Sequence, residues 1–352
     1  MDKSFSFRSL EVASDRKIEV EDDSYLFFGG TAYLGLNNNS DFINLYTEGL
    51  IRYGVNNGTS RSNNVQLNVY DKAEEIAAKR FQAESALIMS SGFLAAQMAI
   101  KYFSTQGELL YAPDCHPALW LDSRPNSPLS FTDWLNFIIR YINDSLNNDF
   151  VVVSNTIDSL VPEIYDFSFF EEVHEGKNIT FLLDDSHGIG ILRLEGSAVV
   201  ANVPKRDCFR SIIVASMAKG LGIDAGVILA DNRAIEQLKN TSIYLGASPP
   251  APAAMYTFIH AEDIYREKYA VLQHNIALFR KHTRKHNISV NNFPGFYFPD
   301  TGLFDLLKKK NIIISSFSYP LSTDPLLNRV VISSAHKEED ILTISREIDS
   351  SV

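Results

Sequence analysis

Several features are missing from the sequence, and each absence excludes a class of protein. Among 352 residues, no apolar run approaches the roughly 20 residues that a transmembrane helix needs. The first residues, Met1 to Phe5, lack the long apolar core of a signal peptide. The two cysteines, Cys115 and Cys208, are too few for a disulfide framework and are typical of a reducing compartment. We therefore expect a cytoplasmic protein with no membrane span.

Positive charge is also scarce. The sequence has 32 Lys and Arg against 43 Asp and Glu, which gives a formal net charge of −11. No basic block interrupts this acidic excess, so nucleic acid and anionic membrane surfaces are poor candidates for partners. Internal repeats and low-complexity tracts are absent too. An anionic ligand would therefore need a local positive feature, such as a helix N-terminus.

What the sequence does contain is a series of short apolar runs separated by helical patterns. The runs, read as buried strands, are 86–89, 108–111, 150–153, 179–183, 212–215 and 226–230. They are continuously apolar rather than alternating, which is typical of a mostly parallel sheet covered by helices on both faces. We predict an α/β fold whose large domain covers residues 41–250. Residues 1–40 precede it as an N-terminal segment, irregular apart from a short strand at Phe27-Phe28.

The helical patterns give the remaining organisation. Within the large domain, helices are predicted over residues 42–53, 70–81, 93–103 and 131–146. Ser248-Pro249-Pro250 then breaks the alternation. We predict one long helix over residues 253–286 and a small C-terminal α+β domain, so that residues 251–352 form the second unit. Its strands are expected at 296–298, 312–314 and 330–332, and its helices at 301–310 and 338–348.

Chemically useful side chains stand where five of the predicted strands end. They are Ser91, His116, Asn155, Asp184 and Lys219. Each has an ordinary explanation by itself, such as a helix cap, a surface histidine or a lysine reaching solvent. In open parallel sheets, however, ligands bind beyond the carboxyl ends of the strands. Five such residues at five strand ends therefore predict a functional site.

The pairing of Lys219 with Asp184 indicates which chemistry this site supports. Lys219 follows a buried strand and lies between Ala218 and Gly220, so its amine is expected to be partly desolvated and suited to a Schiff base. Asp184 would complement a protonated pyridine nitrogen. A metal site at Asp184-Asp185-x-His187 lacks further clustered ligands. No metal is expected.

Three further patterns bear on which ligand or chemistry the site supports. Ser90-Ser91-Gly92 joins a strand to a helix, the geometry in which backbone N–H groups bind a phosphate. The glycines from Gly220 to Gly226 have the wrong spacing for a dinucleotide site. A Cys115–His116 nucleophile is disfavoured, since adjacent residues of an extended chain point apart.

Six motifs also give the sequence a family resemblance. In order, they are Tyr33-Leu34-Gly35-Leu36, Gly58-Thr59-Ser60-Arg61, Ser91-Gly92-Phe93, Asp184-Asp185-Ser186-His187, Ser216-x-x-Lys219-Gly220 and Arg329 to His336. From Tyr33 to His336 the sequence resembles the fold-type I enzymes that depend on pyridoxal phosphate (PLP), and more narrowly the α-oxoamine synthase family. That family includes 8-amino-7-oxononanoate synthase, glycine C-acetyltransferase, 5-aminolevulinate synthase and serine palmitoyltransferase.

The resemblance implies a role for each matching residue. Lys219 would form the Schiff base, Asp184 would pair with the pyridine nitrogen, His187 would bind the ring oxygen and His116 would stack on the ring; these four are the expected catalytic residues. Gly92, Phe93 and Ser216 would hold the phosphate, and Arg329 the substrate carboxylate. The full set expected to bind the cofactor is Ser91, Gly92, Phe93, His116, Asn155, Asp184, His187, Ser216 and Lys219.

The resemblance further implies a homodimer with shared sites, and an acyltransferase reaction that joins an amino acid to an acyl-CoA and releases an α-amino ketone. The sequence departs from the family pattern at four places. These are Thr31, Tyr70, Asn155 with no glutamate beside it, and Leu245-Gly246. Because these departures lie around the substrate, an aminotransferase or C–C lyase of the same fold stays open as the alternative.

Overall fold

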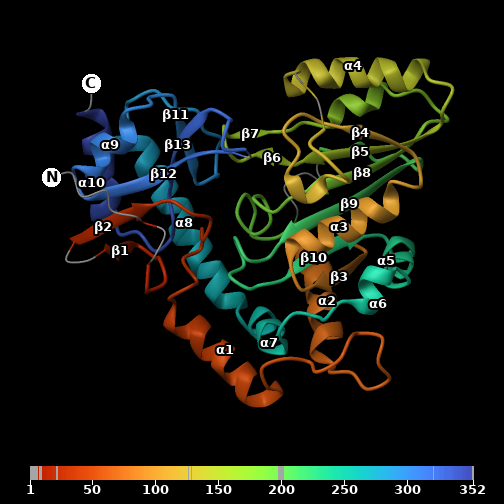
Figure 1. Cartoon of the computed structure of the whole chain (residues 1–352), viewed down its shortest axis with the longest axis horizontal. Coiled ribbons are helices and arrows are strands. Elements are labelled where there is room, and N and C mark those ends of the chain that lie inside the picture. Colours follow the sequence, from red (N-terminus) through yellow and green to blue (C-terminus); the bar gives the residue numbers. More distant parts are fainter. Residues whose placement is uncertain are drawn as a thin grey trace. The chain divides into compact units, whose positions relative to one another are not determined.

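The computed structural model describes residues 7, 10–20, 23–125, 127, 129–196, 202–319 and 321–350. The chain divides into two compact units. The large unit comprises residues 44–158 and 164–262, and the small unit comprises residues 1–43, 159–163 and 263–352. Figure 1 labels the helices and strands of both units. Within the described ranges, no helix combines the length and hydrophobicity needed to cross a bilayer.

The large unit is organised around a six-stranded sheet. Its strands lie in the order β3 (Ser85–Met89), β10 (Gly226–Ala230), β9 (Phe209–Ser216), β8 (Asn178–Asp184), β5 (Asp149–Asn155) and β4 (Glu108–Tyr111). β4, β5, β8 and β9 pair in parallel, whereas β10 runs antiparallel to both of its neighbours. The predicted mostly parallel α/β sheet is therefore confirmed, with one reversed strand.

The apolar runs form strands because both faces of the sheet are covered. All five residues of β10 are buried, and so are the last four residues of β8. Helix α3 (Gly92–Phe103) packs across β3, β8, β9 and β10 and contributes Ala95, Met98 and Ala99 to the core. Small side chains on α3 let the helix approach the sheet closely. The start of this helix is thereby fixed next to the end of β9.

The helices of the large unit follow from local patterns. They are α1 (Ser40–Tyr53), α2 (Val69–Arg80), α3, α4 (Phe131–Asp144), α5 (Asn232–Lys239), α6 (Ser242–Gly246) and α7 (Pro252–His260). In α4 the side chains at spacings of three and four, from Phe131 to Ile142, are buried, and Ser130 caps the first turn by accepting from the N–H of Asp133. The helix ends where Lys177 Nζ donates to the carbonyl of Ser145. Short elements complete the unit: β6 (Ile157–Asp158), β7 (Glu163–Ile164), η1 (Pro117–Leu119) and η2 (Ser168–Glu172).

The single long helix predicted over residues 253–286 is wrong. Two helices, α7 and α8 (Glu262–His282), meet at Ala261, whose backbone leaves the helical region. Arg80 pairs with Glu262 at this break and also lies over the ring of Phe258. The break between α7 and α8 thus coincides with contacts to α2, and no proline or glycine near residue 261 predicts it from the sequence.

The small unit contains a five-stranded sheet in the order β1 (Lys17–Val20), β2 (Asp23–Phe28), β12 (Ile312–Ser318), β13 (Leu326–Val331) and β11 (Gly295–Phe298). Helices α9 (Leu303–Lys308) and α10 (Glu338–Asp349) accompany α8. The N-terminal segment is thus not irregular, because β1 pairs antiparallel with β2, and β2 pairs in parallel with β12. This pairing covers the edge of β12.

A buried histidine ties the small unit together. His336 Nδ1 accepts from the N–H of Ser333 at 3.0 Å, while Nε2 donates to the carbonyl of Phe27 at 2.9 Å. Its ring stacks on Phe28 with centroids 4.0 Å apart. One nitrogen accepts and the other donates, so the imidazole is held neutral. Burial accordingly lowers the pKa of His336 from its ordinary value of 6.5.

The first prediction concerns stability against pH. Below pH 6.5 the unfolded chain binds a proton at His336 more readily than the folded chain does, so the free energy of unfolding should fall as pH drops through this window. His336→Asn should remove this part of the pH dependence and lower stability by about 1–3 kcal/mol at pH 7.5, since buried partners lose hydrogen bonds. Urea unfolding between pH 5 and 8 measures both effects. The exposed His274→Asn serves as control, and an unchanged pH slope in His336→Asn would contradict the prediction.

Candidate active site

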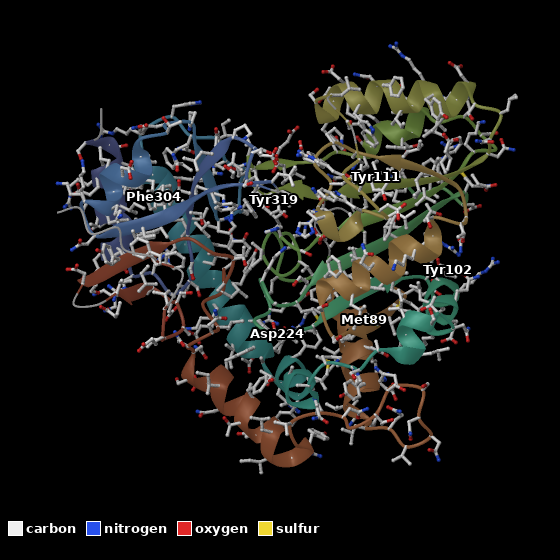
Figure 2. The ribbon with its side chains drawn as sticks, in the orientation of Figure 1. Met89, Tyr102, Tyr111, Asp224, Phe304 and Tyr319 are labelled. Carbon is white, nitrogen blue, oxygen red and sulfur yellow. The ribbon has the colours of Figure 1, made fainter. Side chains whose placement is uncertain are left out.

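The candidate site lies in the large unit, at one edge of its sheet. Because β10 is antiparallel to both β3 and β9, the strands β3, β4, β5, β8 and β9 all end at the same edge. The predicted site residues at or just beyond these ends are Ser91, His116, Asn155, Asp184 and Lys219. Figure 2 labels Met89 and Tyr111, the last residues of β3 and β4, and Asp224 in the turn before β10.

The turns after β8 and β9 interlock and bring Lys219 to His187. Nζ of Lys219 lies 3.0 Å from Nε2 of His187. The approach depends on Gly220, since a Cβ at this position would lie 2.9 Å from the carbonyl oxygen of Ile189. An ammonium at Nζ would donate to Nε2, which requires His187 to carry its proton on Nδ1. The amine and the imidazole are thus able to exchange a proton directly.

The two neighbouring carboxylates have separate environments. Asp184 is 8% exposed; one oxygen accepts from the N–H of Ser186, and the other lies 3.9 Å from Nδ1 of His116. Asp185 is fully buried and accepts from the hydroxyl of Thr156 at 2.6 Å. Its backbone N–H donates to the carbonyl of Val214 on β9. Asp184 therefore belongs to the site, whereas Asp185 anchors the turn that carries it.

His116 lies at the start of η1, with its ring near Asp184. Nδ1 accepts from the N–H of Ala118 at 3.1 Å, so the neutral ring carries its proton on Nε2. Burial lowers the pKa of His116; the Asp184 carboxylate opposes this shift and Lys219 adds to it. Burial and the N–H of Ala118 at Nδ1 therefore both favour the neutral imidazole.

The junction of β3 and α3 is the candidate anion cradle. Ser91 caps the helix by accepting from the N–H of Leu94, while its carbonyl accepts from Ala95. The N–H groups of Gly92 and Phe93 have no acceptor among the described residues, so they could serve an anion at the positive end of the helix dipole. A Cβ on Gly92 would lie 2.6 Å from Cβ of Ser216, so only glycine lets the end of β9 lie this close to the helix start.

A comparison with known families identifies the chain. Residues 139–348, more than half of the sequence, match the model of the family described as aminotransferase class I and II. The chain belongs to the aminotransferase class I and II family. This family uses PLP on fold type I, so the predicted fold and the predicted cofactor are both confirmed.

Individual members of this family extend the likeness over nearly the whole chain. A putative 8-amino-7-oxononanoate synthase of Methanococcus vannielii is 24% identical and covers 95% of this chain and 94% of its own. The corresponding protein of Methanococcus aeolicus is 27% identical, with 93% and 89% covered. A solved serine palmitoyltransferase of S. paucimobilis, with PLP and myriocin bound, has a TM-score of 0.77 at 15% identity and covers 97% of this chain and 91% of that chain. The structural likeness establishes the fold.

The residues of the large unit fit PLP. The cradle at Gly92 suits the phosphate, because it offers two N–H groups with Ser216 beside them. Lys219 would supply the amine for the aldehyde, and Asp184 a buried carboxylate for the pyridine nitrogen. Asp184 and the cradle lie at the ends of different strands of one sheet. PLP would thus be held from both of its polar ends.

One predicted residue, Arg329, belongs to the small unit, where it is 5% exposed and donates through Nη1 to the carbonyl of Ser159 at 2.6 Å. Cys115, which was disfavoured as a nucleophile from the sequence, is buried, its Sγ donates to the carbonyls of Ala112 and Val153, and burial raises the pKa of its thiol. The sequence reading missed Ser186, whose hydroxyl accepts from the N–H of Ser216 and so joins the two turns. The position of Ser186 between Asp184 and His187 in the sequence could have indicated that it belongs to this turn.

The second prediction tests the cradle. Gly92→Ala should overpack the contact with Ser216, at a cost of about 1–3 kcal/mol, and weaken PLP binding by roughly tenfold or more. Titration of the cofactor-free protein with PLP, followed by absorbance, measures this affinity. Gly302→Ala, in the small unit, is the control, since its φ of −86° suits any residue and a Cβ there would lie at an ordinary 3.4 Å from Oδ1 of Asp300. Equal PLP affinities in both variants would exclude Gly92 from the cradle.

Proposed function

We propose that the protein is an α-oxoamine synthase, a PLP-dependent acyltransferase that condenses an amino acid with an acyl-CoA. The observation that carries this proposal is the contact of Lys219 with His187 beside Asp184 at the sheet edge. The names of its relatives, 8-amino-7-oxononanoate synthases, support the acyl transfer. The product class is an α-amino ketone. The particular amino acid and acyl chain are outside the proposal.

The chain's residues would divide the chemistry among them. When bound, PLP supplies an electron sink for negative charge at the amino acid α-carbon. Lys219 takes the proton from that carbon, and His187 at 3.0 Å accepts hydrogen bonds from its ammonium form. Asp184, in its buried position, keeps the pyridine nitrogen protonated. His116 presents a neutral ring to the cofactor face.

We propose Arg329 as the group that binds the substrate carboxylate. In the small unit its Nη1 is already used by Ser159, but Nε is a buried donor with no acceptor among the described residues. A buried guanidinium donor without an acceptor is costly unless a ligand supplies one. A carboxylate matches the guanidinium fork in both charge and geometry. Tyr33 in the same unit is fully buried, and burial raises its pKa to about 12, so it stays a neutral neighbour.

Some features of the site also suit a second reaction class, that of an aminotransferase or a C–C lyase. Asn155 stands at the end of β5, so this strand adds no carboxylate to the site. Tyr70 is buried and donates to the carbonyl of Pro250. A site with these departures also suits an aminotransferase or a C–C lyase, which need no thioester. The products distinguish the classes, because only acyl transfer from coenzyme A releases a thiol.

The third prediction is a test of this function. Incubation with single amino acids and a panel of acyl-CoAs should release thiol only when both substrates are present. Lys219→Ala should lose borohydride-reducible cofactor and slow thiol release at least about a hundredfold, since no base remains at the α-carbon. Lys239→Ala, on α5, is the matched control. Half-transamination without thiol release across the panel would establish the alternative class instead.

We also propose that the protein is a homodimer, which works in the cytoplasm. Apolar side chains are exposed on the large unit: Ile51 (83%) and Val55 (76%) at and after the end of α1, and Leu245 (46%) on α6. The hydroxyl of Ser62 donates to the carbonyl of Leu245 and so joins the polar loop after α1 to α6. Ile51 and Val55 lie close in the sequence and are the more exposed, so we place the proposed subunit interface at the end of α1. Two free cysteines suit a reducing compartment.

The fourth prediction concerns this interface. Ile51→Asp should shift the protein from dimer to monomer in sedimentation velocity, because a carboxylate would be desolvated at the interface. Leu146→Asp is the control, since Leu146 is fully exposed on the loop after α4 and outside the proposed interface. A wild-type protein that sediments as a monomer at all concentrations would rule out the dimer.

A further inference from the structure

Asn155 joins two strand ends through both ends of its side-chain amide. Oδ1 accepts from the backbone N–H of His116 at 3.0 Å, and Nδ2 donates to the carbonyl of Asp114 at 2.7 Å. Asn155 is the last residue of β5, and its register partner on β8 is Asp184. The side chain thus connects the strand beside Asp184 to the loop that carries His116.

The two bonds require an amide in particular. Asp114 has a φ of 53°, the left-handed region that a residue other than glycine occupies only when its surroundings hold it there. The bond from Nδ2 to its carbonyl supplies part of that hold. A carboxylate at position 155 could accept from His116 but would face the carbonyl of Asp114 with a second oxygen, without a donor.

The rest of the loop leaves His116 little freedom. The carbonyl of Cys115 accepts from Trp120 Nε1 at 2.8 Å, and the carbonyl of His116 accepts from the N–H of Leu119. The ring itself is fixed through Nδ1 by Ala118. Two side chains tie this small network to β5: Cys115 Sγ donates to the carbonyl of Val153 at 3.1 Å, and Asn155 bonds to the backbone on both sides of Cys115. Asn155 is the one bonded to His116 itself, whose Nδ1 lies 3.9 Å from Asp184.

We infer that Asn155 is a positioning residue, which holds the His116 ring in place for the cofactor through the backbone of residues 114–116. The sequence suggested a direct contact with the cofactor instead. Both amide ends of Asn155 are engaged by backbone groups, which argues for action through His116. The inference rests on the proposed PLP role of His116, and it is independent of the acyl substrate.

The chain offers a close control for the test. Asn143 on α4 makes the same two bonds at a loop that contributes no residue to the site: Nδ2 donates to the carbonyl of Glu172, and Oδ1 accepts from the N–H of His174. Asn143→Ala therefore removes an equivalent pair of hydrogen bonds. Any difference between Asn155→Ala and Asn143→Ala reports on where the bonds lie rather than on their number.

The fifth prediction is that Asn155→Ala weakens PLP binding by about tenfold, because the His116 ring is then no longer held in place for the cofactor. Asn143→Ala should bind PLP like the wild type. His116→Ala should weaken binding as well, and the double variant Asn155→Ala/His116→Ala should be no weaker than His116→Ala alone. Additive effects of the two substitutions would overturn the inference, since they would mean that Asn155 acts on the cofactor separately.

A second readout uses the full-length protein before PLP is added. The histidine ring signals in NMR, with that of His116 assigned by its loss in His116→Ala, should shift or broaden for His116 in Asn155→Ala and stay unchanged in Asn143→Ala. An unmoved His116 signal in Asn155→Ala would overturn the positioning role. Because this measurement needs no cofactor, it separates failure of the positioning role from failure of the proposed PLP chemistry, which would appear as a wild type that binds no PLP.

Discussion

The close approach of two turns, one after β8 and one after β9, is the constraint on which the site depends. Gly220 lies against the carbonyl of Ile189, and the hydroxyl of Ser186 accepts from the N–H of Ser216. These backbone contacts fix the distance between the amine of Lys219 and the imidazole of His187. Buried Asp185 holds the turn after β8 in place, because it accepts from the hydroxyl of Thr156 and its backbone N–H donates to the carbonyl of Val214 on β9. Side chains with exposed, flexible stems would otherwise lose considerable conformational entropy to meet in one place.

Much of the fold could be predicted from the sequence, because the strands of the large unit are continuously apolar. The run at Gly226–Ala230 predicts β10 with its observed bounds. Such a run has no direction, however, so the reversal of β10 could not be seen. β1 and the first part of β2 were missed for a different reason: among their described residues only Ile18, Tyr25 and Phe28 are buried, and the partner strand β12 lies far along the chain. The break at Ala261 arises from the pairing of Arg80 with Glu262, a tertiary contact.

The candidate site also has parts that could be predicted from the sequence and parts that could not. Asp184, His187 and Lys219 could be predicted to gather, because residues at the carboxyl ends of neighbouring parallel strands must share one edge. Their motifs also carried the family resemblance, and hence the cofactor. The link from Asn155 to His116 could not be predicted, since it depends on the left-handed backbone of Asp114 and on the fold of the loop before η1. Sequence patterns place residues on elements, whereas loop networks decide which atoms meet.

The reversed strand β10 has a consequence for the start of α3. It is the bridge between β3 and β9, and it pairs Met89 with Gly226. Gly226 also lies against the start of α3, since a Cβ there would be 2.2 Å from the carbonyl oxygen of Ser91. Pairings between segments so far apart in the sequence close large loops, which costs chain entropy. The position of the helix start beside Ser216 thus depends on a strand far along the chain, and a larger side chain at Gly226 would displace it.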